Sequence, residues 1–126
     1  MKVLVCGSRE WKNRDAIWRE LKKLPEGTII VHGAARGADR MAGEIARLLG
    51  FEVRQYPADW DNDGRKAAGP IRNSRMLKEE HPDKEGVYID HALAFAVDFS
   101  LKASPGTNDM MGKSRRAGIP VECFSL

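Results

Sequence analysis

Short apolar runs alternate with helix-like segments in the first half of the chain. Residues 3–6 and 29–31 are apolar runs that contain β-branched side chains, and a glycine turn closely follows each of them. Such runs are typical of central strands that are covered by helices on both faces. Between them, apolar side chains recur at helical spacing over residues 17–24, and the proline and glycine at 25–27 end this predicted helix.

The second predicted helix carries the most regular apolar stripe in the chain. Its apolar side chains follow one another at steps of three and four, and Gly50 stands after them as a C-terminal cap. A third strand is expected over residues 51–56, where Pro57 stops it. The resulting β-α-β-α-β order predicts parallel strands with right-handed crossovers. The stripe consists of Ala38, Met41, Ala42, Ile45, Leu48 and Leu49.

The second half of the chain continues this alternation after a polar loop. We expect the loop over residues 58–69, a helix over 70–81, and a fourth strand over 92–97. A helix over 107–117 and a fifth strand over 120–124 complete the chain. The pattern predicts an α/β fold: a three-layer, Rossmann-like open parallel sheet of about five strands with helices on both faces.

Composition narrows the class of protein. The chain has 126 residues, of which 42% are hydrophobic and 31% charged, which fits one domain over residues 1–126 and excludes collagen-like, disordered and disulfide-rich classes. No apolar run is long enough for a signal peptide or a membrane span, so we expect a soluble, cytoplasmic protein. Cys6 and Cys123 are predicted to be reduced thiols in buried strands.

The net charge is mildly positive. A charge of +3 argues against a nucleic-acid partner without excluding one, whereas basic residues grouped over 65–78 and 113–116 fit a rim around an anionic ligand.

The loop over residues 59–64 copies the first half of a calcium-binding EF-hand, but Pro70 stands where the bidentate glutamate belongs. We therefore expect no metal, and no cofactor is indicated.

Candidate ligand contacts begin at the first glycine turn, CGSR over residues 6–9. Gly7 permits a sharp turn and a close approach to the main chain, Ser8 offers a hydroxyl, and Arg9 offers a guanidinium group suited to phosphate or carboxylate. The alternative is an ordinary turn between a strand and a helix, with a surface arginine. The triplet alone does not decide between them.

The second glycine turn, HGAARGAD over residues 32–39, places Arg36 between Gly33 and Gly37 at the start of a helix. Backbone N–H groups and the helix dipole favour an anion there. The turn matches neither the dinucleotide fingerprint nor the P-loop, which argues against an NAD-linked dehydrogenase or a Walker-type ATPase. Asp39 is interpreted as a carboxylate that compensates the helix dipole, with a ribose hydroxyl as the alternative partner, and His32 as a structural residue.

Two further helix starts repeat the arrangement. GPIRN over residues 69–73 brings Arg72 and Asn73 into a first turn, and SPGT over 104–107 supplies Gly106 and the cap candidate Thr107. Each motif alone has a structural explanation, but three glycine-containing helix starts at one sheet edge point together to a nucleotide-like ligand. Trp60 either stacks on a base or covers the sheet edge.

The ordered set of GSR, HGAARGAD, PADW, AGPIRN followed by Met76, and SPGTNDM resembles the SLOG superfamily, in its cpYpsA-related (YspA-like) branch, over residues 3–121. The resemblance implies a Rossmann-like fold that binds nucleotides or nucleotide-derived ligands. Its relatives include the Lonely-guy phosphoribohydrolases, the DNA-processing protein DprA and sensor domains of nucleotide-signalled defence systems. By similarity, the pocket would be lined by Gly7, Ser8, Arg9, Gly33, Arg36, Gly37, Asp39, Arg72, Asn73, Gly106 and Thr107.

One departure from these relatives bears on catalysis. The Lonely-guy enzymes carry PGGxGTxxE, whose glutamate assists N-glycosidic cleavage, whereas here Met110 occupies the glutamate position and Asp109 stands one residue early. Asp109 is the one catalytic candidate. The sequence favours a binding module for a phosphorylated nucleoside, acting through a partner or as a homo-oligomer; the alternatives are a nucleotide hydrolase and, third, a DprA-like DNA-binding protein.

Overall fold

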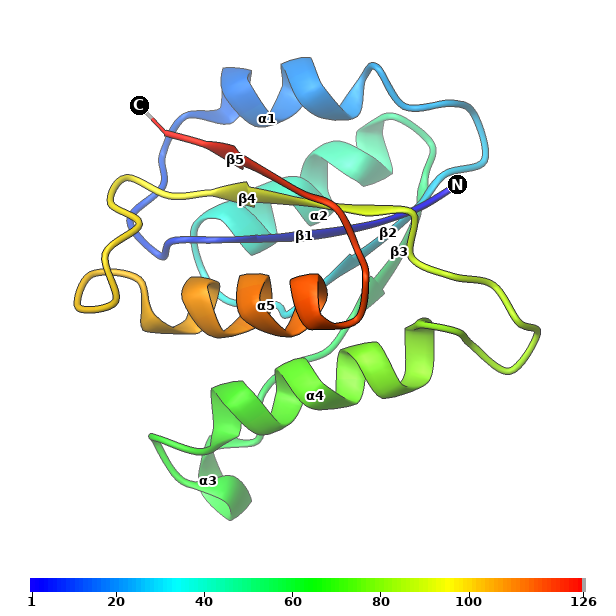
Figure 1. Cartoon of the computed structure of the whole chain (residues 1–126). Coiled ribbons are helices and arrows are strands. Elements are labelled where there is room, and N and C mark those ends of the chain that lie inside the picture. The colour runs from blue at the N-terminus through cyan, green and yellow to red at the C-terminus, as the bar shows by residue number, and fades with distance from the viewer. Residues whose placement is uncertain (126) are drawn as a thin grey trace.

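The computed structural model describes residues 1–125 and has an α/β architecture with a five-stranded sheet (Figure 1). The strands stand in the order β3-β2-β1-β4-β5, and every neighbouring pair is parallel. The predicted open parallel sheet is therefore confirmed. The strands are β1 (Lys2–Gly7), β2 (Ile29–His32), β3 (Glu52–Gln55), β4 (His91–Phe95) and β5 (Val121–Phe124).

The helices form two layers that cover opposite faces of the sheet (Figure 1). On one face α1 packs on α2, and on the other α4 packs on α5. The short helix α3 lies at the start of α4. The helices are α1 (Arg14–Leu21), α2 (Ala38–Leu48), α3 (Trp60–Asp63), α4 (Ala68–Glu80) and α5 (Pro105–Arg116).

The order of the strands creates a switch point beside the central strand β1. The chain moves outward from β1 through β2 to β3, and then returns through α4 to place β4 on the other side of β1. Loops after β1 and β4 therefore lead to opposite faces of the sheet and leave a crevice at the carboxyl ends of these strands. Ligands of open α/β sheets bind in this position.

Two apolar clusters, one on each face of the sheet, form the core. Alternate side chains of β1 enter different clusters, because successive residues of a strand point to opposite faces. Val3 and Val5 pack with the cluster that includes Ile45, whereas Leu4 and Cys6 pack with the cluster that includes Met110. The continuous apolar run at the start of the sequence thus reflects burial of β1 on both faces.

A buried ionic cluster lies at the amino-terminal edge of the sheet. Lys2 Nζ is fully buried, 2.9 Å from Glu80 Oε1 and 2.9 Å from Asp83 Oδ2. Arg54 Nη1 also contacts Glu80 Oε1, at 2.8 Å, and the hydroxyl of Tyr56 donates to Glu80 Oε2. These contacts attach the end of α4 to the first and third strands, and so position the opposite end of α4 at the crevice.

Several predicted boundaries were wrong by a few residues. The helix expected from residue 70 begins at Ala68, because Pro70 is tolerated in its first turn, and the helix expected from residue 107 begins at Pro105. The loop predicted over residues 58–69 contains α3, whose first N–H groups are capped by Asp59: its Oδ1 accepts from the backbone N–H of Asn62 at 3.2 Å. Asp59 therefore acts as a helix cap.

One prediction of burial was also wrong, and one end of the apolar stripe is exposed. Cys123 is exposed, because β5 is an edge strand, and Glu122 beside it is exposed as well. Leu48, the last residue of α2, is 72% exposed although it continues the apolar stripe. Within residues 1–125 no helix has the length and apolar character needed to cross a membrane.

Candidate functional site

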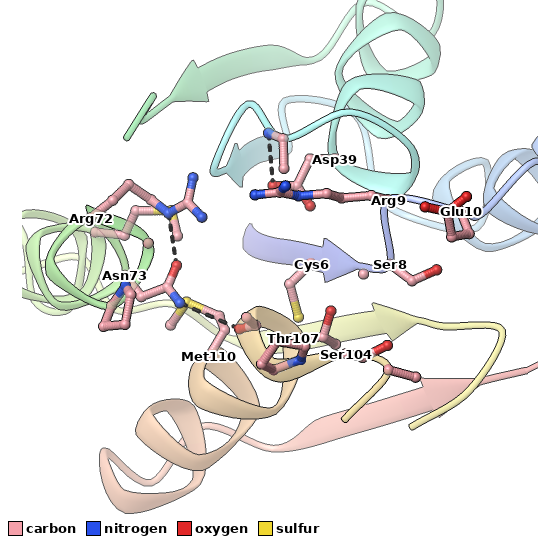
Figure 2. A pocket seen from close by; sticks show the side chains of 18 of the residues that line it. Cys6, Ser8, Arg9, Glu10, Asp39, Arg72, Asn73, Ser104, Thr107 and Met110 are labelled. Atoms are coloured by element: carbon pink, nitrogen blue, oxygen red, sulfur yellow. Dashed lines mark hydrogen bonds between the residues drawn. The ribbon is translucent and has the colours of Figure 1, made fainter. Parts of the chain in front are cut away.

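A pocket of about 540 Å³ lies at the carboxyl end of β1 (Figure 2). The turn after β1 forms one wall, and the first turns of α4 and α5 form another, with Asp39 of α2 contributing from the far side. The side chains of the lining include Cys6, Ser8, Arg9, Glu10, Asp39, Trp60, Arg65, Lys66, Arg72, Asn73, Met76, Ser104, Thr107 and Met110.

The first turn of α5 faces this pocket without a side-chain cap. Ser104 occupies the cap position, but its hydroxyl donates to the carbonyl oxygen of Asp98 at 2.6 Å and makes no capping hydrogen bond. Pro105 has no N–H, and the N–H groups of Gly106 and Thr107 have no acceptor among residues 1–125. Free N–H groups at a helix start attract anions.

Ser8 adds an unpartnered hydroxyl to the same pocket. Its backbone is held firmly, because its N–H donates to the carbonyl oxygen of Phe95 at 2.8 Å and its own carbonyl accepts from the N–H of Ala38 at 3.2 Å. The residue is 7% exposed, and its buried Oγ has no hydrogen-bond partner in the described part of the chain. A buried polar atom without a partner costs stability, and such atoms are rare in folded proteins.

Two arginines bring positive charge to the pocket from opposite sides (Figure 2). Arg72 Nε donates to Asn73 Oδ1 at 2.8 Å, and Nη1 donates to the carbonyl oxygen of Gly33. The Arg9 guanidinium lies 5.4 Å from the centre of the Trp60 ring. Burial lowers the pKa of Arg72, and the nearby charge of Arg9 contributes to this shift.

Asp39 holds the second glycine turn in place. Its Oδ2 accepts from the N–H of Gly33 at 3.0 Å and from that of Ala35 at 3.4 Å. Burial raises the pKa of Asp39 to about 6, against the opposing effects of Arg72 and of these hydrogen bonds. The N–H groups of Gly33 and Ala35, which the sequence offered to an anion, are therefore directed at a carboxylate of the protein itself.

The glycines of the first two turns are required by packing. A Cβ at Gly7 would overlap the carbonyl oxygen of Phe95, and a Cβ at Gly33 would stand 2.6 Å from Cζ of Arg72. Gly37 has a positive φ of 83°, and a Cβ there would lie 2.6 Å from the carbonyl oxygen of Arg9. By contrast, a Cβ at Gly106 would enter open space.

His32, the last residue of β2, does not line the pocket and has a structural environment. Its Nδ1 accepts from the N–H of Ala34 at 2.9 Å, while its buried Nε2 has no partner within the described residues and is directed at Gly43. Burial, together with the positive charges of Arg47 and Arg72, lowers the pKa of His32 to about 4. The ring is therefore neutral at pH 7.

Asp109, the catalytic candidate, does not line the pocket. Its Oδ2 accepts from Asn73 Nδ2 at 3.0 Å and lies 2.6 Å from Nζ of Lys113. Lys113 Nζ also donates to the carbonyl oxygen of Pro70 at 3.1 Å. The carboxylate thus joins α4 to α5, and Met110 presents the apolar side chain that lines the pocket.

The pocket brings together most of the residues singled out in the sequence. Gly33 and Arg36 instead line a neighbouring groove, and Gly37 lines neither hollow. Cys6 was interpreted only as core, but it forms part of the pocket floor, where burial raises the pKa of its thiol. The residues in the main pocket are Gly7, Ser8, Arg9, Asp39, Arg72, Asn73, Gly106 and Thr107.

Fold and pocket define a Rossmann-like protein with a basic pocket at the switch point of its sheet. A sequence model of the YspA, cpYpsA-related SLOG family matches residues 1–62. The chain is also 40% identical to the gene 61 protein of Mycobacterium phage D29. The alignment extends over 132 residues and covers 98% of this chain and 95% of the phage protein. The chain belongs to the YspA, cpYpsA-related SLOG family, and this membership indicates a nucleotide-related binding or processing role.

Proposed function

We propose that the protein binds a phosphorylated nucleoside or a nucleotide-derived ligand, with a phosphate at the first turn of α5. The observation that carries the proposal is the uncapped start of this helix, which shares its pocket with the unpartnered hydroxyl of Ser8. A phosphate oxygen would accept from the free N–H groups of Gly106 and Thr107 and from the Ser8 hydroxyl. Hydrogen bonds to a charged acceptor are the strong ones.

The charge of the pocket supports an anionic ligand. Its lining has four cationic side chains, Arg9, Arg65, Lys66 and Arg72, against the carboxyl groups of Glu10 and Asp39. Burial raises the pKa of Asp39 to about 6, so this residue carries its negative charge at pH 7 and loses it as the pH falls through 6. A net positive pocket concentrates anions and strengthens their hydrogen bonds.

The size and apolar wall of the pocket support a ligand larger than inorganic phosphate. A volume of about 540 Å³ falls in the range of small-molecule sites, roughly 300–1,000 Å³. Met76 and Met110 are buried side chains of the lining, and Trp60, which is 44% exposed, stands at the mouth. Flexible thioethers and an aromatic ring supply the apolar surface that a nucleobase requires.

The hydrolase alternative receives less support from the site. Asp109, the one carboxyl group of α5, is engaged by Asn73 and Lys113 and lies outside the pocket lining. Asp39 does line it, but one of its oxygens holds the second glycine turn. Binding without turnover is therefore the function that we propose, in agreement with the family's nucleotide-related role.

A matched pair of serine variants tests the proposal. Ser8 and Ser114 both carry a buried, unpartnered Oγ, but only Ser8 lines the pocket. Ser8→Ala and Ser114→Ala should both leave stability unchanged or slightly raised, because each removes an unsatisfied polar atom. Nucleoside monophosphates are screened by thermal shift and then titrated by calorimetry. They should bind Ser8→Ala about tenfold more weakly than wild type, which corresponds to a loss of about 1.4 kcal/mol in binding free energy, typical of one hydrogen bond to a charged group.

Ser114→Ala should retain wild-type affinity. If the wild-type protein binds no nucleotide at millimolar concentration, or if the two variants lose affinity equally, the proposed site is wrong. Analysis of the ligand recovered after binding shows in the same experiment whether it has been cleaved.

A further inference from the structure

A second hollow, which we call the arginine groove, opens beside the main pocket and has a volume of about 440 Å³. The two hollows share Arg9, Ala35, Trp60 and Arg72, so they adjoin at these four residues. The remaining lining comes from the second glycine turn, the start of α2 and the segment after β3: Gly33, Ala34, Arg36, Arg40, Pro57 and Ala58.

The groove is lined by four arginines, Arg9, Arg36, Arg40 and Arg72, and by no carboxyl group of the part of the chain that the structure describes. Arg36 has one ion pair, 3.5 Å from Glu10, in which both side chains are more than two-thirds exposed. Such an exposed pair neutralises little charge. Arg40 forms no ion pair with any residue from 1 to 125, and its Nε donates to the carbonyl oxygen of Ala34 at 3.2 Å.

Such a concentration of like charge is unfavourable in the free protein. Arg72 shows the effect, because the positive charges of Arg9 and Arg75 lower its pKa in addition to the effect of burial. A bound anion would relieve this repulsion, and guanidinium groups bind phosphate oxygens with two parallel hydrogen bonds. Arg9 and Arg72 stand where the two hollows join, so one anion in each hollow would contact the same pair of arginines.

We infer that the arginine groove holds a second anionic group of the ligand, so that the preferred ligand is a nucleotide with at least two phosphate groups. One phosphate lies at the start of α5, and the other lies between Arg36, Arg40 and the shared arginines. This inference rests on the proposed function, because the groove extends the same site. It adds that nucleoside monophosphates fill only part of that site.

Calorimetric titration with three adenine nucleotides tests the inference. AMP carries one phosphate, ADP carries two in a chain, and adenosine 3′,5′-bisphosphate carries two at separate positions. We expect at least one of the two-phosphate ligands to bind wild-type protein about tenfold or more tightly than AMP, the gain of one charge-assisted hydrogen bond. Which of them binds more tightly shows whether the second phosphate belongs to a chain or to the other side of the ribose.

Two variants and a control assign that gain to the groove. Arg36→Gln and Arg40→Gln remove charges that line only the groove, whereas Arg19→Gln removes an exposed charge of α1 that lines neither hollow. Each groove variant should weaken the two-phosphate ligand at least about fivefold and leave AMP affinity within twofold, because AMP does not reach the groove. Arg19→Gln should bind every ligand as wild type does.

The outcomes separate this inference from the proposed function. If AMP binds and the two-phosphate ligands bind no more tightly, or if the groove variants weaken AMP as much as the others, the second subsite is wrong and the main site stands. If none of the three nucleotides binds, and the wider panel of nucleotides gives no binding either, the proposed function itself fails, and the inference fails with it.

Discussion

The guanidinium group of Arg72 occupies the space that a side chain at position 33 would fill. Its Nη1 donates to the carbonyl oxygen of Gly33, and a Cβ on that residue would stand 2.6 Å from Cζ of Arg72. The glycine after β2 therefore lets an arginine of α4 reach across the carboxyl edge of the sheet. This relationship joins the second glycine turn to the main pocket.

Gly33→Ala should displace Arg72 and weaken ligand binding. The added methyl group forces the guanidinium away from its acceptors, at a cost in stability of about 1–3 kcal/mol, typical of overpacking. Nucleotide affinity should fall about tenfold with the loss of a charge-assisted contact. Urea denaturation and calorimetry measure the two effects.

The matched control for this variant is Gly112→Ala, at a helical glycine of α5 where the nearest atom to a new Cβ is a flexible guanidinium end 3.3 Å away. Alanine is favoured over glycine inside a helix, by up to about 1 kcal/mol, so this variant should be as stable as wild type or more so. Unchanged nucleotide affinity in Gly33→Ala would show that the position of Arg72 does not matter for binding.

His32 and Asp39 should make opposite contributions to the pH dependence of stability. The pKa of His32 is lowered to about 4 in the folded protein, so between pH 4 and 6.5 the unfolded chain binds more protons at this residue and stability rises with pH. The pKa of Asp39 is raised to about 6, so between pH 3.8 and 6 the folded protein binds more protons and stability falls as the pH rises. Each contribution amounts to about 3 kcal/mol.

Single variants should separate these two contributions. From pH 4.5 to 6, Asp39→Asn should gain stability with rising pH relative to wild type, because only the His32 contribution remains. His32→Gln should lose stability with rising pH relative to wild type, for the converse reason. Urea denaturation at several pH values measures both slopes, and parallel curves for all three proteins would contradict the assignment.

Lys2→Met should destabilise the protein strongly. The variant leaves Glu80 and Asp83 without the fully buried ammonium group that lies 2.9 Å from each of them. Removing one partner of a buried ion pair costs about 3–5 kcal/mol, and the remaining contact of Arg54 with Glu80 places the expected loss at the lower end of this range. Lys23→Met removes an exposed partner of Glu20 and should cost less than about 1 kcal/mol in the same denaturation experiment. Equal effects would show that the buried cluster contributes no more than a surface pair.

Asp109→Asn should affect the contact between α4 and α5 and no catalytic step. The carboxylate is held 2.6 Å from Lys113 Nζ, outside the pocket lining, so its loss should reduce stability by about 1 kcal/mol and leave nucleotide affinity nearly unchanged. Chromatography should recover intact nucleotide after incubation with wild-type protein. Cleavage by wild type that Asp109→Asn abolishes, with affinity preserved, would establish the hydrolase alternative in place of the binding module.

The sequence by itself determined the layers of this protein. The apolar run over residues 3–6 predicts that β1 is buried on both faces, and the structure shows this burial. The apolar stripe over residues 38–49 likewise predicts the helix α2. Both predictions were possible because side-chain periodicity depends only on local backbone geometry. The same patterns required parallel strands, since helices join the strands. Helix starts were less accurate, because Pro70 and Thr107 are compatible with more than one position in a first turn.

Tertiary structure alone decided what the motif residues do. Local sequence predicted free N–H groups at HGAARGAD, but Asp39 folds back to accept from them, while the free donors lie at SPGT. Arg36, which lies between the two glycines of HGAARGAD, was expected in the main pocket but lines only the arginine groove. Arg72, from α4, lines both hollows. The positions of Arg36 and Arg72 depend on which side chains meet across strands and helices distant in sequence, as the contact of Arg72 with Gly33 shows. Within HGAARGAD, competition between hydrogen-bond partners gives the N–H groups to Asp39. Burial and this competition settle both outcomes only after the chain has folded.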